Sequence, residues 1–208
     1  PYETNNLANN LEYREQLIDL RNTLTKWVKG MPDLSFYPES ELTKEAFQRP
    51  VSFGQSHKSE IAELIDISNL SLLSFEDARA GIKSALESND PFKKYWGLIV
   101  CSSFGLEASE FYELAKMLGE DNHLLVRTRA AEFLALTGQV HPKQVINKVL
   151  QSTKNDIEAL LVLNTVVLLM DGIYQYKFDI SRDMIDQKIM ERDWIQRRIE
   201  YVEDRQKD

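Results

Sequence analysis

Three glycines recur at nearly equal spacing in the second half of the chain, and an apolar segment with helical periodicity precedes each of them. They are Gly105, Gly138 and Gly172, which lie 33 and 34 residues apart. Glycine commonly follows the last turn of a helix. A regular repeat of this length is typical of arrays in which each helical unit buries its apolar face against neighbouring units.

Each glycine closes two predicted helices rather than one. The second helix of each pair is expected at 90–104, 122–137 and 155–171, and the first at 75–87, 108–118 and 141–151. Asp90 and Pro91 form the clearest start signal, because aspartate caps helix N-termini and proline is favoured at the first helical position. The pattern predicts an all-α protein in which residues 60–208 form an α-solenoid, a right-handed array of helix pairs.

The second of these pairs resembles a known repeat. In the HEAT family, the second helix of a repeat carries an aspartate, then valine-arginine, then two alanines. The matching residues here are Asp121, Val126, Arg127, Ala130 and Ala131. The resemblance implies a HEAT-like repeat domain, although the spacing is shorter than the ~40–47 residues typical of HEAT repeats.

The first 59 residues follow a different pattern and are expected to form a separate region. Apolar residues at three- and four-residue steps predict one helix over about residues 11–29: Leu17, Leu20, Leu24, Trp27 and Val28. Between residues 31 and 59, three prolines and a glycine exclude a long helix: Pro32, Pro38, Pro50 and Gly54. The aromatic residues of this irregular segment still require burial: Phe36, Tyr37, Phe47 and Phe53.

The end of the chain predicts a cap on the array. Residues 174–178 alternate aromatic and polar side chains, which favours a short extended connection, and 181–206 predict one charged amphipathic helix. Its buried side is expected to hold six residues: Met184, Ile185, Ile189, Ile195, Ile199 and Val202. Its acidic and basic residues nearly balance, which suits a polar outer face.

Charge and composition exclude several classes of function. The formal net charge is -8 and the sequence pI about 5.1, which disfavours nucleic acid as a partner and argues against a HEAT-like DNA-repair enzyme. The longest apolar run, residues 159–170, is shorter than the ~20 residues that span a membrane. The single cysteine, Cys101, is interpreted as buried and inert, and the three histidines lack metal-ligand spacing.

The N-terminal region resembles the end of a sulfatase. In that family a proline turn leads into Glu and Asn-Leu-Ala, then into a helix with a leucine and tryptophan pattern. The corresponding segments here are 1–8 and the helix carrying Leu17, Leu20, Leu24 and Trp27. Asp33 and the Pro-Glu-x-Glu-Leu segment at 38–42 are similar to heparan N-sulfatase-like (N-sulfoglucosamine sulfohydrolase-like) members.

This resemblance covers about residues 1–45 and implies a C-terminal region cut from a longer enzyme, because the chain begins at Pro1 without a methionine. Sulfatases use a formylglycine made in a Cys/Ser-x-Pro-x-Arg motif, together with a calcium ion. Both are expected in the missing catalytic domain, since the segment after Cys101 lacks the proline and the arginine. We therefore expect no catalytic, cofactor-binding or metal-binding residue in this chain, and a periplasmic or extracellular parent protein.

Six charged residues are candidates for a surface that meets a partner or substrate: Glu39, Glu41, Lys93, Lys94, Arg127 and Arg129. The two glutamates could act as a carboxylate pair or lie in a solvated loop with salt bridges. The four cations occupy similar places in successive repeats, so they could meet a sulfated sugar or an acidic partner. The alternative is a ladder of salt bridges to the abundant acidic residues.

Two functional hypotheses follow. In the first, the chain is the non-catalytic C-terminal region of a secreted sulfatase that acts on sulfate esters or sulfamates of glycans, and it packs on the catalytic domain, shapes the substrate entrance or mediates homo-oligomerisation. In the second, it is a free-standing helical-repeat module that binds another protein. The first predicts that the residues 1–45 pattern reflects contact with an enzyme domain.

Overall fold

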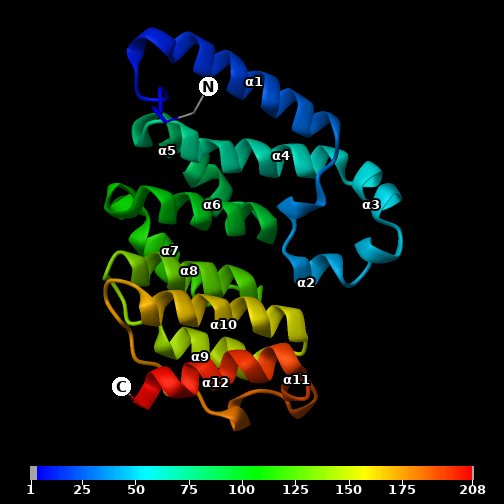
Figure 1. The fold of residues 1–208 in the computed structure, drawn as a ribbon, viewed down its shortest axis with the longest axis vertical. Coiled ribbons are helices and arrows are strands. Elements are labelled where there is room, and N and C mark those ends of the chain that lie inside the picture. Colours follow the sequence, from blue (N-terminus) through cyan, green and yellow to red (C-terminus); the bar gives the residue numbers. More distant parts are fainter. Residues whose placement is uncertain (1–3, 208) are drawn as a thin grey trace.

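A computed structural model describes residues 4–207, and all of the regular secondary structure in this range is helical (Figure 1). The all-α prediction is confirmed. Pro1, Tyr2 and Glu3, which begin the sulfatase-like segment, lie outside the described residues. The α-helices are α1 Arg14–Gly30, α2 Glu39–Leu42, α3 Pro50–Ser56, α4 Lys58–Asn69, α5 Phe75–Leu86, α6 Pro91–Phe104, α7 Tyr112–Leu118, α8 Leu124–Leu136, α9 Lys143–Ser152, α10 Asp156–Asp171, α11 Gln187–Met190 and α12 Asp193–Lys207.

Side-chain caps explain why the starts of several helices could be predicted. The Asp90 carboxylate accepts from the Phe92 backbone N–H at 2.8 Å, directly before Pro91 at the first position of α6. The Asn155 side chain accepts from the Glu158 N–H at 2.9 Å and opens α10 in the same way. These groups satisfy N–H donors that have no partner inside the helix.

From α4 onward the helices form a stack in which each successive group of helices packs on the group before it (Figure 1). Helix α6 contacts α4, α5 and α8, and helix α8 contacts α7, α9 and α10. Helix α12 closes the stack by packing on α10. One continuous core runs from α5 to α12, and a smaller core joins residues 37–46 to α4. The HEAT-like solenoid geometry stays a prediction.

All three repeated glycines follow a helix end, but they differ in backbone conformation. Gly105 and Gly138 have φ of 58° and 71°, which is the left-handed region that favours glycine. Gly172 caps α10 with a φ of -74°, and Gln175 takes the left-handed conformation three residues later. A Cβ atom at Gly138 would lie 2.7 Å from the ring of Tyr174, so a side chain here would force that ring to move.

The segment between α1 and α4 contains no long helix, as predicted, but it folds into short helices that cover the edge of the stack (Figure 1). Pro50 begins α3 instead of only interrupting the chain. Tyr37 is 6% exposed and its hydroxyl donates to Glu60 on α4 at 2.9 Å. The prediction of burial is wrong for Phe47, which is 54% exposed because it lies at the edge of a surface cleft.

The predicted single helix over residues 181–206 is also wrong. The chain forms a 3-10 turn at Arg182–Met184, then α11, and only then α12. Asp186 explains one break, because its side chain accepts from the Lys188 N–H and caps α11. The expected buried side is otherwise correct, except that Met184 is only partly buried.

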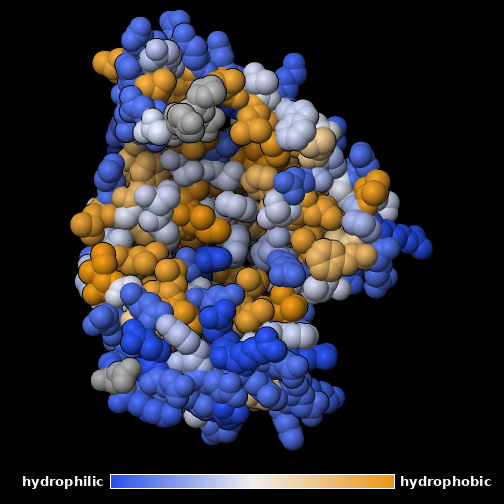
Figure 2. All heavy atoms as spheres, viewed as in Figure 1, coloured by the Kyte–Doolittle hydropathy of each residue, from blue (hydrophilic) through white to orange (hydrophobic). Residues whose placement is uncertain are grey.

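Helix α12 presents a hydrophilic outer face at one end of the stack. Figure 2 shows this end almost wholly covered by hydrophilic residues, while apolar side chains gather across the middle of the same view. The connection after α10, predicted to be extended, begins with a turn at residues 173–174 and a left-handed Gln175, and residues 175–181 form no regular secondary structure. Phe178 anchors this connection in the core with no exposed surface. The prediction of a polar cap at this end fits these observations.

Candidate functional site

The opposite end of the stack is formed by α1 and carries an exposed apolar face. We name this face the α1 stripe: Leu20, Leu24 and Trp27 on the helix, which are 69%, 59% and 60% exposed, with Met31 just after it. Single exposed apolar residues are normal, but three or four in a row along one helix mark an interaction surface. The described structure therefore has a hydrophilic face at the α12 end and an exposed apolar stripe at the α1 end.

The α1 stripe stays exposed because another face of α1 holds the helix on the stack. Arg21 donates to the Leu72 carbonyl oxygen at 3.3 Å, and the Asn69 amide donates to the Thr25 hydroxyl at 3.1 Å. Lys29 forms an ion pair with Asp66 on α4. Val28 packs against the smaller core, but these contacts leave Leu20, Leu24 and Trp27 pointing away from the rest of the described chain.

The two candidate glutamates on α2 have different environments. Glu39 is exposed, whereas the Glu41 side chain is 17% exposed. Lys44 lies 2.8 Å from Glu41, and His123 Nε2, at the start of α8, lies 3.6 Å away. The pKa of Glu41 is lowered to about 2. The hydrogen bond with His123 is the largest cause, and Lys44 lowers the pKa further, while burial acts in the opposite direction.

This shift predicts an acid-sensitive contact between α2 and α8. The folded state favours ionised Glu41, so the contact contributes its full stability above the ordinary pKa of 4.5 and loses it as pH falls towards 2. We expect Glu41→Gln to lower the free energy of unfolding by about 1–2 kcal/mol at pH 7. Urea unfolding at pH 7, 4 and 3 checks this, and a difference from the unmodified protein that does not shrink with acid would contradict it.

Each candidate cation has an acidic neighbour. Lys93 pairs with Glu63, and Lys94 lies 2.6 Å from Asp121. Arg127 donates to the Gly119 carbonyl oxygen at 3.2 Å and lies 4.0 Å from Glu120. Arg129 pairs with Glu132 at 2.6 Å. This is the arrangement that the salt-bridge alternative predicts, and the structure does not bring these four cations together as an unpaired patch.

The Arg129 pair belongs to a network that sequence reasoning missed. Glu132 is 5% exposed and also accepts from the Thr165 hydroxyl on α10 at 2.8 Å. Arg129 donates to the Tyr95 hydroxyl on α6 at 2.9 Å. The i,i+3 spacing of Arg129 and Glu132 on one helix was the available signal, because such residues are neighbours on the helix surface. The network joins the second helices of three successive pairs.

Arg129 also lies in a cleft between the short-helix segment and the stack. The cleft has a volume of about 540 Å³. One wall comes from residues 35–47 and the other from α6, α8 and α10. Trp96 fixes the two walls relative to each other, because its indole N–H donates to the Phe36 carbonyl oxygen at 2.8 Å. The lining is mostly aromatic and aliphatic, with Glu39 and Arg129 as its charged groups.

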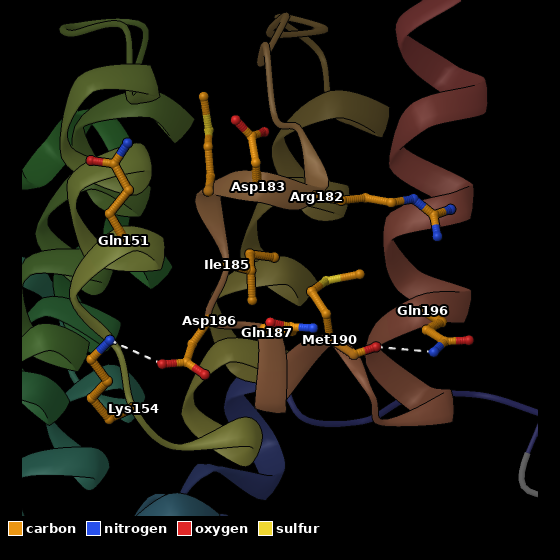
Figure 3. A pocket seen from close by; sticks show the side chains of 10 residues that line it. Gln151, Lys154, Arg182, Asp183, Ile185, Asp186, Gln187, Met190 and Gln196 are labelled. Atoms are coloured by element: carbon orange, nitrogen blue, oxygen red, sulfur yellow. Dashed lines mark hydrogen bonds and ion pairs between the residues drawn. The ribbon is translucent and has the colours of Figure 1, made fainter.

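A second hollow lies at the other end of the chain, between the end of α9 and the segment before α12 (Figure 3). It is wide open and its volume is about 760 Å³. Its polar groups bind one another: Lys154 lies 3.1 Å from Asp186, and the Gln196 amide donates to the Met190 carbonyl oxygen at 3.0 Å. The described residues that line it include no Ser, Thr, Cys or His side chain.

Cys101 is fully buried in α6, and burial raises the pKa of its thiol to about 12. Because thiol reagents attack the accessible thiolate, we expect no labelling of the native chain by a disulfide reagent at pH 8. One thiol per chain should react after denaturation, since the chain has a single cysteine. Absorbance of the released thiolate measures this, and labelling of the native protein within minutes would contradict the buried position.

The part of the chain that the structure describes contains no group of three or more His, Cys, Asp or Glu side chains that could hold a metal ion. Within residues 4–207, no helix combines the length and the apolar character needed to cross a membrane. The charged residues instead form pairs and small networks that connect helices. The α1 stripe and the aromatic cleft are two features of the described residues that are open to a partner or ligand.

Comparison with known proteins gives one short similarity. No protein-family model matches the chain, and no solved structure matches it. An ulvan-active sulfatase from Formosa agariphila is 48% identical over 42 residues. These residues are 20% of this chain but only 7% of the relative, so the chain covers a small part of that protein. The chain is thus related, over about a fifth of its length, to a sulfatase.

Proposed function

We propose that this chain is a non-catalytic C-terminal region of a sulfatase and that the α1 stripe packs against the catalytic domain of the same protein. The α1 stripe is the observation that carries this proposal. Contact with another domain would bury Leu20, Leu24 and Trp27. Each Å² of apolar surface removed from water stabilises such a contact by about 25 cal/mol. A helical stack with a polar cap at one end and an apolar face at the other is suited to continue into another domain at the apolar end.

The short sulfatase similarity supports the identity of that domain. The catalytic domain would carry the formylglycine, the calcium ion and the residues that hydrolyse sulfate esters or sulfamates of a glycan. The Formosa relative is named for activity on ulvan, so a sulfated polysaccharide is the substrate class that we assign to the parent. The parent would act in the periplasm or outside the cell, and a HEAT-like array would serve domain packing, the substrate entrance or self-association.

The full-length gene product tests the proposal. It should contain a Cys/Ser-x-Pro-x-Arg motif before Pro1 and release sulfate from ulvan, whereas the 208-residue chain alone should release none. Changing Leu24 and Trp27 together to glutamate should leave the thermal unfolding of the isolated chain unchanged. In the full-length protein the same change should lower the unfolding temperature by several degrees and reduce activity.

Leu106→Glu provides the matched control, because Leu106 is 68% exposed but lies in the 3-10 helix that follows α6 and not on α1. This change should have no effect in either form of the protein. A gene product without the formylglycine motif would refute the sulfatase assignment. Full activity and stability of the Leu24 and Trp27 variant would refute the docking role of the α1 stripe.

A free-standing protein-binding module remains the second candidate. Exposed apolar residues at the turns of the stack favour it, above all Ile173, which is 97% exposed next to Tyr174 at 51%. A protein partner that binds this edge would be lost on Ile173→Asp and kept in the Leu24 and Trp27 variant. The two candidate functions therefore differ in which surface is required: the α1 stripe for the sulfatase region, and the edge with Ile173 for the protein-binding module.

A further inference from the structure

We propose that the cleft between residues 35–47 and the stack binds one uncharged sugar unit of a glycan. The cleft volume of about 540 Å³ falls within the ~300–1,000 Å³ typical of small-molecule sites. Like such sites, it has mostly apolar and aromatic walls with a few polar groups. The inference goes beyond the sulfatase assignment and does not depend on it.

The aromatic walls fit the apolar C–H face of a pyranose ring. Trp96 and Phe36 lie with ring centroids 5.4 Å apart and line one part of the cleft. Phe47, from the short-helix segment, lines the cleft and is 54% exposed. A large apolar side chain held at an open position has no role in the core, but it can cover a ligand that enters the cleft.

The polar groups fit hydroxyl groups. Arg129 uses Nη1 for Glu132 and one N–H of Nη2 for the Tyr95 hydroxyl. A guanidinium has five N–H donors, so its Nε–H and one Nη2–H have no acceptor among residues 4–207. The Arg129 side chain is 23% exposed and lines the cleft, and Glu39 offers acceptor oxygens there. A cleft lined by both a donor and an acceptor group matches a sugar hydroxyl, which needs both.

Charge decides against a sulfated unit at this position. Glu132 neutralises Arg129 at 2.6 Å, and the other charged group of the cleft, Glu39, is an anion. A sulfate placed here would meet a carboxylate and a cation that is already paired, within a chain of net charge -8. The cleft would therefore hold a glycan through a unit that carries no sulfate.

Trp96 can report on the cleft directly. The chain has three tryptophans, so a Trp27→Phe and Trp194→Phe variant leaves Trp96 as the single emitter. This variant is titrated with the methyl glycosides of glucose, galactose, mannose, xylose and rhamnose, and with galactose 6-sulfate. At least one neutral glycoside should change the emission with saturation at millimolar concentration, independently of salt.

Binding should weaken at least about fivefold in Phe47→Ala and in Glu39→Gln, both at exposed positions that leave the fold intact. Leu106→Ala is the matched control, because Leu106 does not line the cleft, and it should bind as before. The proposal is overturned if none of the five neutral glycosides perturbs Trp96. It is equally overturned if galactose 6-sulfate binds and no neutral glycoside does, or if the binding of the neutral glycoside weakens as salt is added. Equal affinities of Phe47→Ala and Leu106→Ala for the glycoside would also overturn it.

Discussion

Replacing Glu132 by alanine should lower the free energy of unfolding by about 3–5 kcal/mol. Its carboxylate is almost fully buried and accepts hydrogen bonds from Arg129 and Thr165. Without it, the Arg129 guanidinium stays mostly buried with the Tyr95 hydroxyl as its remaining partner. A buried charge without a counter-ion is costly, and the Thr165 hydroxyl would lose its acceptor as well.

Urea unfolding followed by circular dichroism measures this effect. Removing both charges is the informative control, because a buried ion pair can be replaced by apolar residues of similar size at little cost. Arg129→Met combined with Glu132→Leu should therefore lose less stability than Glu132→Ala alone. Arg129→Met and Glu132→Leu are also measured singly. If their two losses simply add in the double variant, Arg129 and Glu132 do not interact as the structure places them.

Phe133→Ala should also lower the free energy of unfolding by about 3–5 kcal/mol, but through a cavity rather than a charge. Phe133 is 0% exposed on α8, and its ring centroid lies 5.5 Å from that of Tyr112 on α7. Helix α8 packs against four other helices, so the surrounding residues have little freedom to fill the space left by the ring.

Phe47→Ala provides the matched control, because it removes the same atoms from a position that is 54% exposed. Its cost should be below about 1 kcal/mol. Thermal and urea unfolding of both variants measure the two losses in the free energy of unfolding. Equal losses at Phe47 and Phe133 would mean that α8 is not the centre of the core.

Much of the helical arrangement could be predicted because its signals are local. Asp90, Pro91 and Asn155 lie next to the helices that they open, and the glycines follow the helices that they close. The division of residues 181–206 could not be predicted in this way, because its apolar spacing fits a single helix. The cap formed by Asp186, together with burial against α9 and α10, decides that region.

The contacts of the candidate site residues also divide into those that local sequence predicts and those that depend on the fold. Arg129 and Glu132 lie three residues apart on one helix, so their pairing was accessible from the sequence. The pairing of Lys94 with Asp121, and the approach of Glu41 to His123, join residues from different helices and depend on the fold. The aromatic cleft is of the second kind, since its two walls come from separate parts of the chain.

The short helices between α1 and α4 change how the stack can respond to force. In a helical array where each unit contacts only its neighbours, units can separate one at a time under force. Here Phe36 is tied to α6, Glu41 reaches the start of α8, and α2 contacts α10. These tethers cross several units, so they should stiffen the array, slow its folding through contacts distant in sequence, and make it yield as one body.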